Sequence, residues 1–146
     1  GLEAAHRTIS GFEFARNFTW EIGNRWEQIS EKLRNGRIKD GLACSYERYC
    51  EMRALVERCR QRLAPIIGKY DVLLTAAAAG EAPVGWEPVP HPWVYMVWTT
   101  MHVPSVTLPV FKGPNGLPIG AQLVAKRSDD RRLFAAARWV YRTLKQ

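Results

Sequence analysis

Two apolar runs joined by a short polar tip, within residues 103–125, constrain the fold of this chain more than any other stretch. The tip contains Asn115 and Gly116, which reach positive φ at low cost, so the two runs are predicted to form a β-hairpin. Both arms are apolar enough to be buried, and buried arms of this kind belong to a larger sheet. The hairpin therefore predicts a β-sheet that other elements cover.

The residues of each arm predict its place in the sheet. The second arm, residues 117–125, has Gln122 as its only polar side chain, so it is predicted to be covered on both faces. The first arm contains Pro104 and Pro109, and proline cannot donate a hydrogen bond to a neighbouring strand. The first arm is therefore predicted to lie at an edge of the sheet or to enter it from a bend.

A third strand and several helices complete the predicted elements. Residues 71–75 form a short apolar run that is predicted to be a strand buried on both faces. Apolar residues at helical spacing predict helical structure at residues 2–33, either as two consecutive helices or as one that bends near Gly23, with an end at Asn35-Gly36. The same spacing predicts helices at residues 42–66, 93–101 and 128–144. The longest of these carries an apolar stripe that we assign to packing: Leu42, Tyr46, Tyr49, Met52, Val56, Cys59, Leu63 and Ile66.

The order of these elements predicts an α/β fold, with N-terminal helices followed by a small mixed β-sheet and a C-terminal helix. The length of 146 residues fits a single domain or a fragment of one, with a helical segment at residues 1–68 and a strand-hairpin-helix segment at residues 69–146. The helical pattern is already under way at Gly1, and the chain has no initiator methionine. We therefore expect a fragment.

Charge and hydropathy exclude two classes of partner. No apolar run approaches the ~20 residues of a membrane span, and the first residues lack the order of a signal peptide, so we expect a cytoplasmic protein without membrane contact. The net charge of +7 would attract nucleic acid, but basic and acidic residues are interspersed and no groove-reading motif accompanies them. Nucleic-acid binding is therefore not expected.

Metal and disulfide chemistry are also disfavoured. Cys44, Cys50 and Cys59 lie in one helical segment, and their odd number does not form a disulfide framework. The chain has no Cys-x-x-Cys or His-Glu-x-x-His spacing to hold a metal ion. The expected thiols are reduced, and no metal or cofactor is predicted.

Three stretches carry a resemblance to a known family. They are residues 70–75, residues 103–109 and residues 115–124, followed by a helix that holds Asp130, Leu133 and Ala136. Together they resemble the C-terminal region of the amidase signature family of amide hydrolases. The resemblance covers nearly all the chain and is strongest from Tyr70 onward.

The resemblance does not extend to the catalytic residues. Enzymes of this family use a serine nucleophile with a second serine and a lysine as proton relay, in a loop rich in glycine and serine. The serines of this chain do not lie in such a loop: Ser10, Ser30, Ser45, Ser105 and Ser128. Ser105 has the surroundings of a strand-entry residue, and nothing near it in sequence supplies a base. No catalytic residue is predicted in this chain.

The resemblance does imply part of a substrate pocket. The loop after Thr75, the segment that ends in His102 and the bend at Pro104 resemble parts that border the substrate cleft in the family. The candidate pocket residues are Trp98, Thr99 and His102. The family often has asparagine and glycine where this chain has Thr99 and His102, which leaves the substrate class open. His102 is either a proton-transfer group or a hydrogen-bonded packing residue.

Three functions remain open from the sequence. The preferred one is the C-terminal segment of an amidase-type amide hydrolase, which acts on carbon–nitrogen bonds other than peptide bonds and binds a small-molecule amide. Such a segment would supply scaffold and pocket wall, and it would associate with the missing N-terminal amidase region or with itself. The alternatives are a stand-alone interaction module that is not an enzyme, and the corresponding segment of an amidotransferase subunit.

Overall fold

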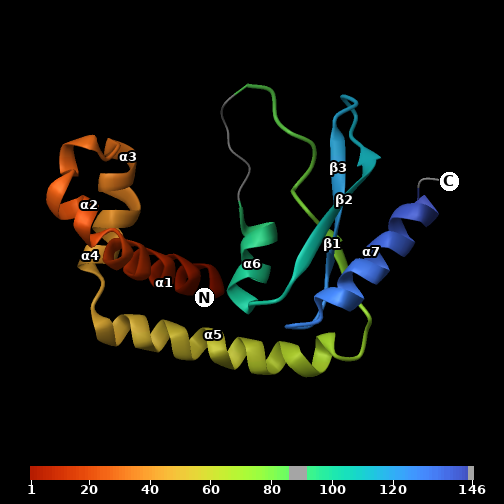
Figure 1. Ribbon diagram of the computed structural model, residues 1–146, viewed down its shortest axis with the longest axis horizontal. Helices are drawn as coiled ribbons and strands as arrows, with labels where there is room; N and C mark the ends of the chain where they lie inside the picture. The colour runs from red at the N-terminus through yellow and green to blue at the C-terminus, as the bar shows by residue number, and fades with distance from the viewer. Residues whose placement is uncertain (86–91, 145–146) are drawn as a thin grey trace. The chain divides into compact units, whose positions relative to one another are not determined.

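The computed structural model describes residues 1–85 and 92–144 of the chain (Figure 1). They form two compact units, unit 1 (Gly1–Arg58) and unit 2 (Cys59–Gln146). In chain order the elements are α1 (Leu2–Asn17), α2 (Thr19–Asn24), the 3₁₀ turn η1 (Trp26–Gln28), α3 (Glu31–Leu33), the π-helical turn η2 (Arg34–Ile38), α4 (Lys39–Ala43), α5 (Tyr46–Ile67), β1 (Leu73–Ala76), α6 (Trp93–Met101), β2 (Ser105–Lys112), β3 (Pro118–Val124) and α7 (Asp130–Leu144). None of the described helices is long and apolar enough to cross a membrane.

Unit 1 is built on a close approach of α1 to α4. Gly11 and Gly41 are both buried where the two helices meet. A methyl group on Gly41 would overlap the carbonyl oxygen of Gly11 and lie 2.9 Å from Cβ of Ala15. The two glycines therefore allow backbone-to-backbone packing that any side chain would prevent. Gly11 weakens helix propensity locally, but it makes this contact possible.

The predicted helix end at Asn35-Gly36 is wrong. Gly36 has φ of −103° and ψ of −108°, which is not the left-handed conformation that commonly ends helices. The chain kinks there, and helical structure continues through α4. The predicted bend near Gly23 agrees with the end of α2 at Asn24.

The longest predicted helix is present as α5, and its ends have local causes. The Ser45 hydroxyl oxygen accepts a hydrogen bond from the Arg48 backbone N–H at 3.1 Å, as an N-cap residue does. The helix ends at Ile67, just before Gly68 and two residues after Pro65. These local residues set the ends of α5, and the helix begins at Tyr46 rather than at the predicted Leu42.

The assignment of the whole α5 stripe to packing is wrong. Val56 is buried, but Tyr46 and Ile66 are 70% and 54% exposed. Tyr49 stacks on Phe12 of α1 with ring centroids 4.1 Å apart. Helical spacing identifies a face of a helix, and the face is buried only where a neighbouring element covers it.

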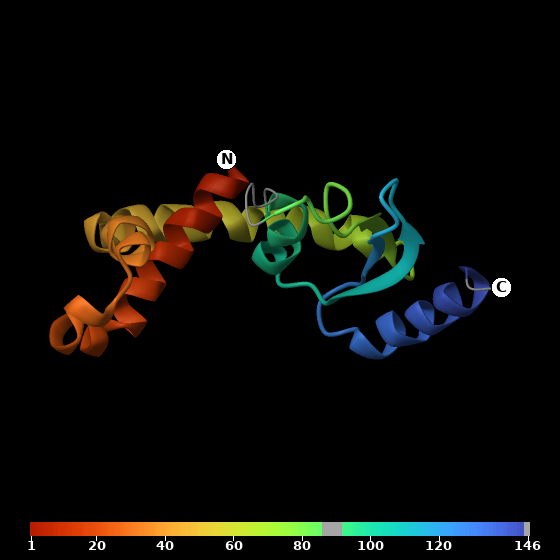
Figure 2. The same ribbon diagram turned by 90° about the horizontal axis from the view of Figure 1, so that it is seen from above.

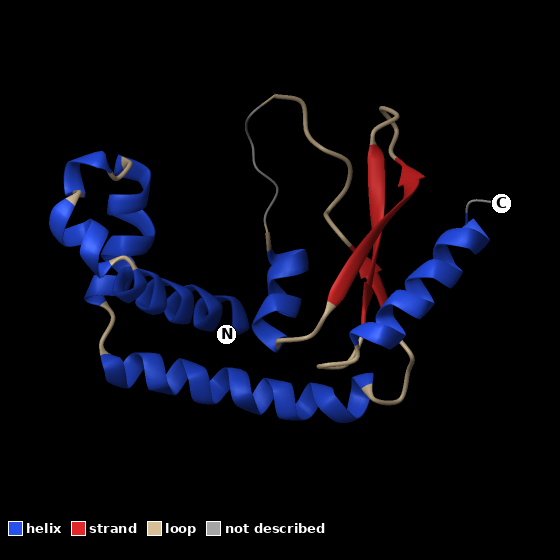
Figure 3. Ribbon diagram, viewed as in Figure 1, coloured by secondary structure: helices blue, strands red, loops and turns tan. Residues whose placement is uncertain are grey.

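The sheet is antiparallel in both of its strand pairs, with the order β1-β3-β2 (Figure 3). The predicted order of helices, sheet and C-terminal helix is confirmed, whereas the expected mixed sheet is not, because β1 and β2 both run opposite to β3. The second arm is confirmed as the covered one: β3 is central, and its residues 121–124 are buried. The first arm, β2, is confirmed as an edge strand, and the pairing is irregular between Leu108 and Phe111, at Pro109.

The prediction that residues 71–75 are buried on both faces is wrong. The strand runs from Leu73 to Ala76 and forms the other edge of the sheet. Leu74 is 70% exposed. An apolar run without alternation predicts a strand covered on both faces, but burial alternates along β1, with Leu73 and Thr75 half-buried and Leu74 and Ala76 exposed.

The core of unit 2 lies between the sheet and α7. It contains Leu108, Leu123, Ala125, Leu133 and Ala137. Leu133 and Ala137 lie on α7, four residues apart, and are both buried. Figure 2, seen from above, shows α7 lying along the sheet that these residues join.

Candidate functional site

The candidate pocket residues lie at the end of α6 and in the turn that leads into β2. His102 ends the helix in the left-handed conformation, with φ of 55° and ψ of 41°. Its N–H donates to the Thr99 carbonyl at 3.1 Å, and the Val103 N–H donates to the Trp98 carbonyl at 3.3 Å. These bonds reverse the chain so that β2 starts at Ser105. Trp98, Thr99 and His102 are therefore brought together within one turn.

The conformation of His102 explains a difference from the family pattern. Glycine, which the family often has here, enters the left-handed region without steric cost. A residue with a Cβ is less favourable there by about 1 kcal/mol. This chain thus places an exposed imidazole at a strained turn. Strain of this kind is found more often at functional sites than elsewhere.

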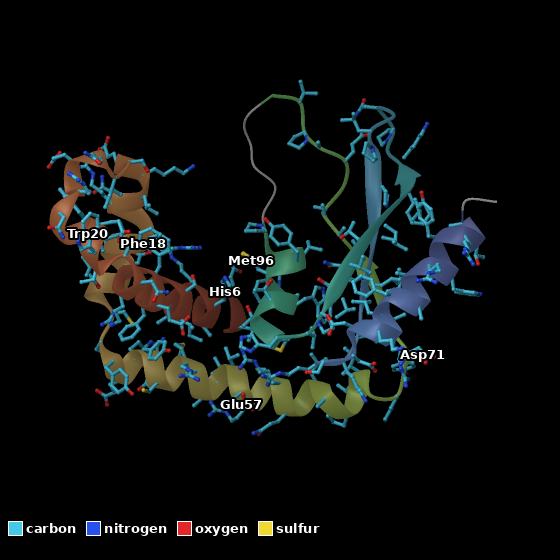
Figure 4. All side chains as sticks on the ribbon, viewed as in Figure 1. His6, Phe18, Trp20, Glu57, Asp71 and Met96 are labelled. Carbon is cyan, nitrogen blue, oxygen red and sulfur yellow. The ribbon has the colours of Figure 1, made fainter. Side chains whose placement is uncertain are left out.

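α6 is fixed to α5 by an arginine. Nε and Nη2 of Arg60 donate to the Thr100 carbonyl oxygen at 3.1 and 2.8 Å. Thr100 and Met101 are buried, and the Thr100 hydroxyl donates to the carbonyl of Met96, which Figure 4 labels on α6. A cation at the carboxyl end of a helix is also favoured by the helix dipole. Arg60 therefore holds the helical turn that carries the candidate residues.

The exposure of the three residues differs. Thr99 and His102 are exposed, whereas Trp98 is half-buried. The indole Nε1 of Trp98 is buried and has no hydrogen-bond partner among the described residues. The exposed residues of this turn offer a hydroxyl and an imidazole, which are able to hydrogen-bond a polar ligand, whereas the indole N–H is not accessible.

Ser105 lies in the first position of β2, three residues after His102. Its hydroxyl oxygen accepts a weak hydrogen bond from Nε2 of Gln122 at 3.4 Å. An amide cannot remove a proton from a hydroxyl, so this contact does not activate a nucleophile. The structural interpretation of Ser105 as a strand-entry residue agrees with this position.

Two hollows lie on α7, away from these residues. One of about 540 Å³ is bordered by residues 69–72, Arg132 and Trp139, and another of about 620 Å³ by Arg131, Phe134 and Arg138. Neither includes Trp98, Thr99 or His102. Within residues 1–85 and 92–144, no group of three or more His, Cys, Asp and Glu side chains could hold a metal ion.

Comparison of the sequence with known proteins finds a partial match to an amide hydrolase. No family model matches the chain. The chain is 27% identical over 109 residues to fatty-acid amide hydrolase 2 from Homo sapiens, which covers 73% of this chain and 20% of that protein. The chain thus spans about a fifth of the length of this curated relative.

Solved structures match over almost the whole chain. An amidase superimposes with a TM-score of 0.85 at 24% identity, over 96% of this chain and 35% of the amidase. An inhibitor-bound complex connected with the origins of an s-triazine catabolic enzyme gives 0.77 at 21% identity, over 90% and 32%. A bacterial aryl acylamidase of the amidase signature family gives 0.69 at 18% identity, over 92% and 32%. The chain therefore has the fold of about a third of an amidase signature enzyme, as its sequence motifs predict.

Proposed function

We propose that this chain supplies the scaffold and one wall of the substrate pocket in an amidase-type amide hydrolase. The proposal is carried by the match to about a third of an amidase over 96% of this chain. The nucleophile and proton relay would come from the part of the fold that this chain does not contain. The substrate would be a small-molecule amide with a carbon–nitrogen bond other than a peptide bond. A cytoplasmic location stays a prediction. The division of the chain into a helical segment at residues 1–68 and a strand-hairpin-helix segment at residues 69–146 also stays a prediction.

Trp98, Thr99 and His102 are proposed to line the pocket. The support for this proposal is their position at one turn, where the chain reverses, and the exposure of Thr99 and His102. Small-molecule sites combine aromatic side chains with a few polar groups, and this turn carries residues of both kinds. They would orient the amide and leave bond cleavage to residues outside this chain.

The isolated chain is expected not to hydrolyse amides. A serine needs an adjacent base and oriented N–H donors, and the Gln122 contact of Ser105 supplies neither. Aryl amides and aryl esters would be incubated with the chain and with the Ser105→Ala variant, and neither should show turnover.

A longer protein that also contains the remaining part of the amidase fold should hydrolyse these substrates. In that protein Thr99→Ala should raise KM about tenfold with kcat nearly unchanged.

Turnover by the isolated chain that disappears in Ser105→Ala would overturn this assignment of roles. Thr143→Ala is the matched control for Thr99→Ala in the longer protein, and it should leave KM unchanged. It removes the hydroxyl that donates to the Trp139 carbonyl on α7, outside the candidate pocket residues. Absence of a loop rich in glycine and serine upstream of Gly1, together with no hydrolysis by the longer protein, would instead favour the stand-alone interaction module. The exposed Leu74 on β1 is the observation that favours this second function.

The chain is expected to associate, either with itself or with the remaining amidase region. Both edges of the three-stranded sheet belong to unit 2, and Leu74 on the β1 edge is 70% exposed. Uncovered strand edges pair readily, and large apolar patches are uncommon on monomers. Light scattering over a dilution series should give a mass above 16.7 kDa at the higher concentrations. Leu74→Lys should shift the series toward the monomer, and a single monomer mass throughout would contradict self-association.

A further inference from the structure

The loop that follows β1 is joined to the tip of the hairpin by one carboxylate. Oε1 of Glu81 accepts a hydrogen bond from the Asn115 backbone N–H at 2.9 Å and another from the Asn115 side-chain amide. Oε2 accepts a third from the Leu117 backbone N–H at 3.1 Å. A methyl group at Gly113 would overlap the Glu81 carboxyl group, so the absence of a side chain there lets the loop lie directly against the tip. Figure 1 shows the loop beside the hairpin that contains these donors.

Asn115 and Gly116 form the exposed part of a tight turn. The Gly116 N–H donates to the Gly113 carbonyl at 3.0 Å, and the Gly113 N–H donates to the Leu117 carbonyl at 2.8 Å, so the tip closes on itself. Gly116 has φ of 81°, a conformation that glycine adopts at low cost. Both Asn115 and Gly116 are exposed, so water reaches them.

An asparagine followed by a glycine is able to react with its own backbone. The backbone nitrogen of Gly116 attacks Cγ of Asn115 and gives up its proton, a new C–N bond forms, the Cγ–Nδ2 bond breaks and ammonia leaves. Water then opens the resulting succinimide ring at either carbonyl, which gives aspartate or isoaspartate. Glycine favours the attack because it has no Cβ to obstruct its nitrogen. The net change is hydrolysis of the side-chain amide, and water is the only reactant that it needs.

Glu81 opposes this reaction in two ways. Its hydrogen bonds hold the Asn115 side chain in place, whereas the attack requires Cγ to approach the Gly116 nitrogen. Its negative charge also disfavours the anionic intermediate that forms at Cγ, because like charges repel at short range. The Gly113 carbonyl in turn holds the proton that the Gly116 nitrogen must lose. The folded tip therefore slows a reaction that the same two residues undergo readily in a flexible chain.

The product of the reaction changes the contact with Glu81. The asparagine amide donates to Oε1, whereas the carboxylate of an aspartate only accepts hydrogen bonds. Deamidation thus removes a donor and places a second negative charge against Glu81. We propose that Asn115 is a deamidation site whose rate is set by Glu81, and that its conversion to aspartate detaches the loop after β1 from the hairpin tip. This inference does not depend on the proposed function.

Peptide mapping by mass spectrometry tests the rate. The purified chain is held in mildly alkaline buffer, and the mass gained when the side-chain amide becomes a carboxyl group is followed at Asn115. In Glu81→Ala the reaction should speed up about fivefold or more, because the hydrogen bonds and the charge are both lost. Glu81→Gln removes the charge but keeps one acceptor oxygen, so it should give a smaller increase. The chain unfolded in urea should react faster than the folded chain.

Asn35-Gly36 provides the control in the same samples. It is the other Asn-Gly pair of the chain, and its side-chain amide donates to a different carboxylate, that of Glu31 at 3.4 Å. Its rate should be the same in the native chain and in both Glu81 variants. Equal rates at Asn115 in the native chain and in Glu81→Ala, or in the folded chain and in urea, would overturn the role assigned to Glu81.

Hydrogen exchange followed by NMR tests the release of the loop. Asn115→Asp reproduces the aspartate product, and the Leu117 amide, which donates to Glu81, should exchange about fivefold faster in it. Adding Glu81→Gln to Asn115→Asp removes the repulsion and should restore part of the protection. High salt should also restore part of it, because salt screens exposed charges. The Ala125 amide, which donates to the Pro104 carbonyl at 3.1 Å, should stay protected and shows that the variants are folded.

The exchange of the Leu117 amide decides the second half of the proposal. Unchanged exchange in Asn115→Asp would overturn the release of the loop. Faster exchange that neither salt nor the added Glu81→Gln reduces would overturn repulsion as its cause. None of these measurements involves the hydrolysis of an added amide, so they are separate from a failure of the longer protein to hydrolyse its substrates, which would overturn the proposed function instead.

Discussion

The Gly41→Ala variant is expected to lose about 3 kcal/mol of the free energy of unfolding of unit 1. The added methyl group would overlap the Gly11 carbonyl oxygen and lie 2.6 Å from the Gly11 carbonyl carbon. These are backbone atoms of a neighbouring helix, so no side chain can turn aside to make room. α1 and α4 would have to separate, and buried residues such as Phe12 and Ile38 would be partly uncovered.

Urea unfolding followed by far-UV circular dichroism measures this loss. Gly23→Ala is the matched control, because a methyl group at Gly23 in α2 meets nothing within 4 Å. Alanine is the better helix former, so this control should gain up to about 1 kcal/mol. Equal unfolding midpoints for the two variants would show that the close approach of α1 and α4 is not needed for stability.

The second large effect is expected in the core of unit 2, where Leu123→Ala should cost about 3 kcal/mol. Leu123 is 1% exposed in the central strand and packs in the cluster with Leu108 and Leu133. Removing its terminal carbons loses their transfer from water and leaves a cavity that the sheet and α7 cannot fully close.

Leu74→Ala is the control for this prediction. Leu74 lies directly across from Leu123 in the β1–β3 pair, but its side chain is largely exposed. The same chemical change should therefore cost well under half as much, or about 1 kcal/mol at most. Thermal unfolding of both variants at concentrations where the chain is monomeric provides the comparison. Equal losses in the monomer would contradict the prediction, because the largely exposed Leu74 would then stabilise the chain as much as the buried Leu123.

The hairpin and most helices follow from local rules that the sequence carries. Asn115 and Gly116 supply the turn, Pro109 keeps β2 at an edge, and Ser45 caps α5. Each effect depends on residues close together in the chain. Sequence reasoning therefore placed these elements correctly, and the family motifs identified the fold that the solved amidase structures share.

The candidate site was only partly predictable. The sequence resemblance named Trp98, Thr99 and His102, and the helix ending at His102 explains how one turn brings them together. The anchor of this turn came from the structure, where Arg60 reaches the Thr100 carbonyl across 40 residues. Arginines are common in this chain, so nothing in the local sequence distinguishes Arg60.

By itself, then, the sequence determined which segments are helix, strand and turn, because those preferences come from neighbouring residues and from short-range spacing. Only the tertiary structure decided that Gly11 and Gly41 meet, that Gly36 kinks a helix instead of ending it, and that the α5 stripe is exposed at Tyr46 and Ile66. Burial and close approach depend on which distant segment arrives at a surface. A periodic pattern marks a face that is able to pack, and the fold selects the faces that do.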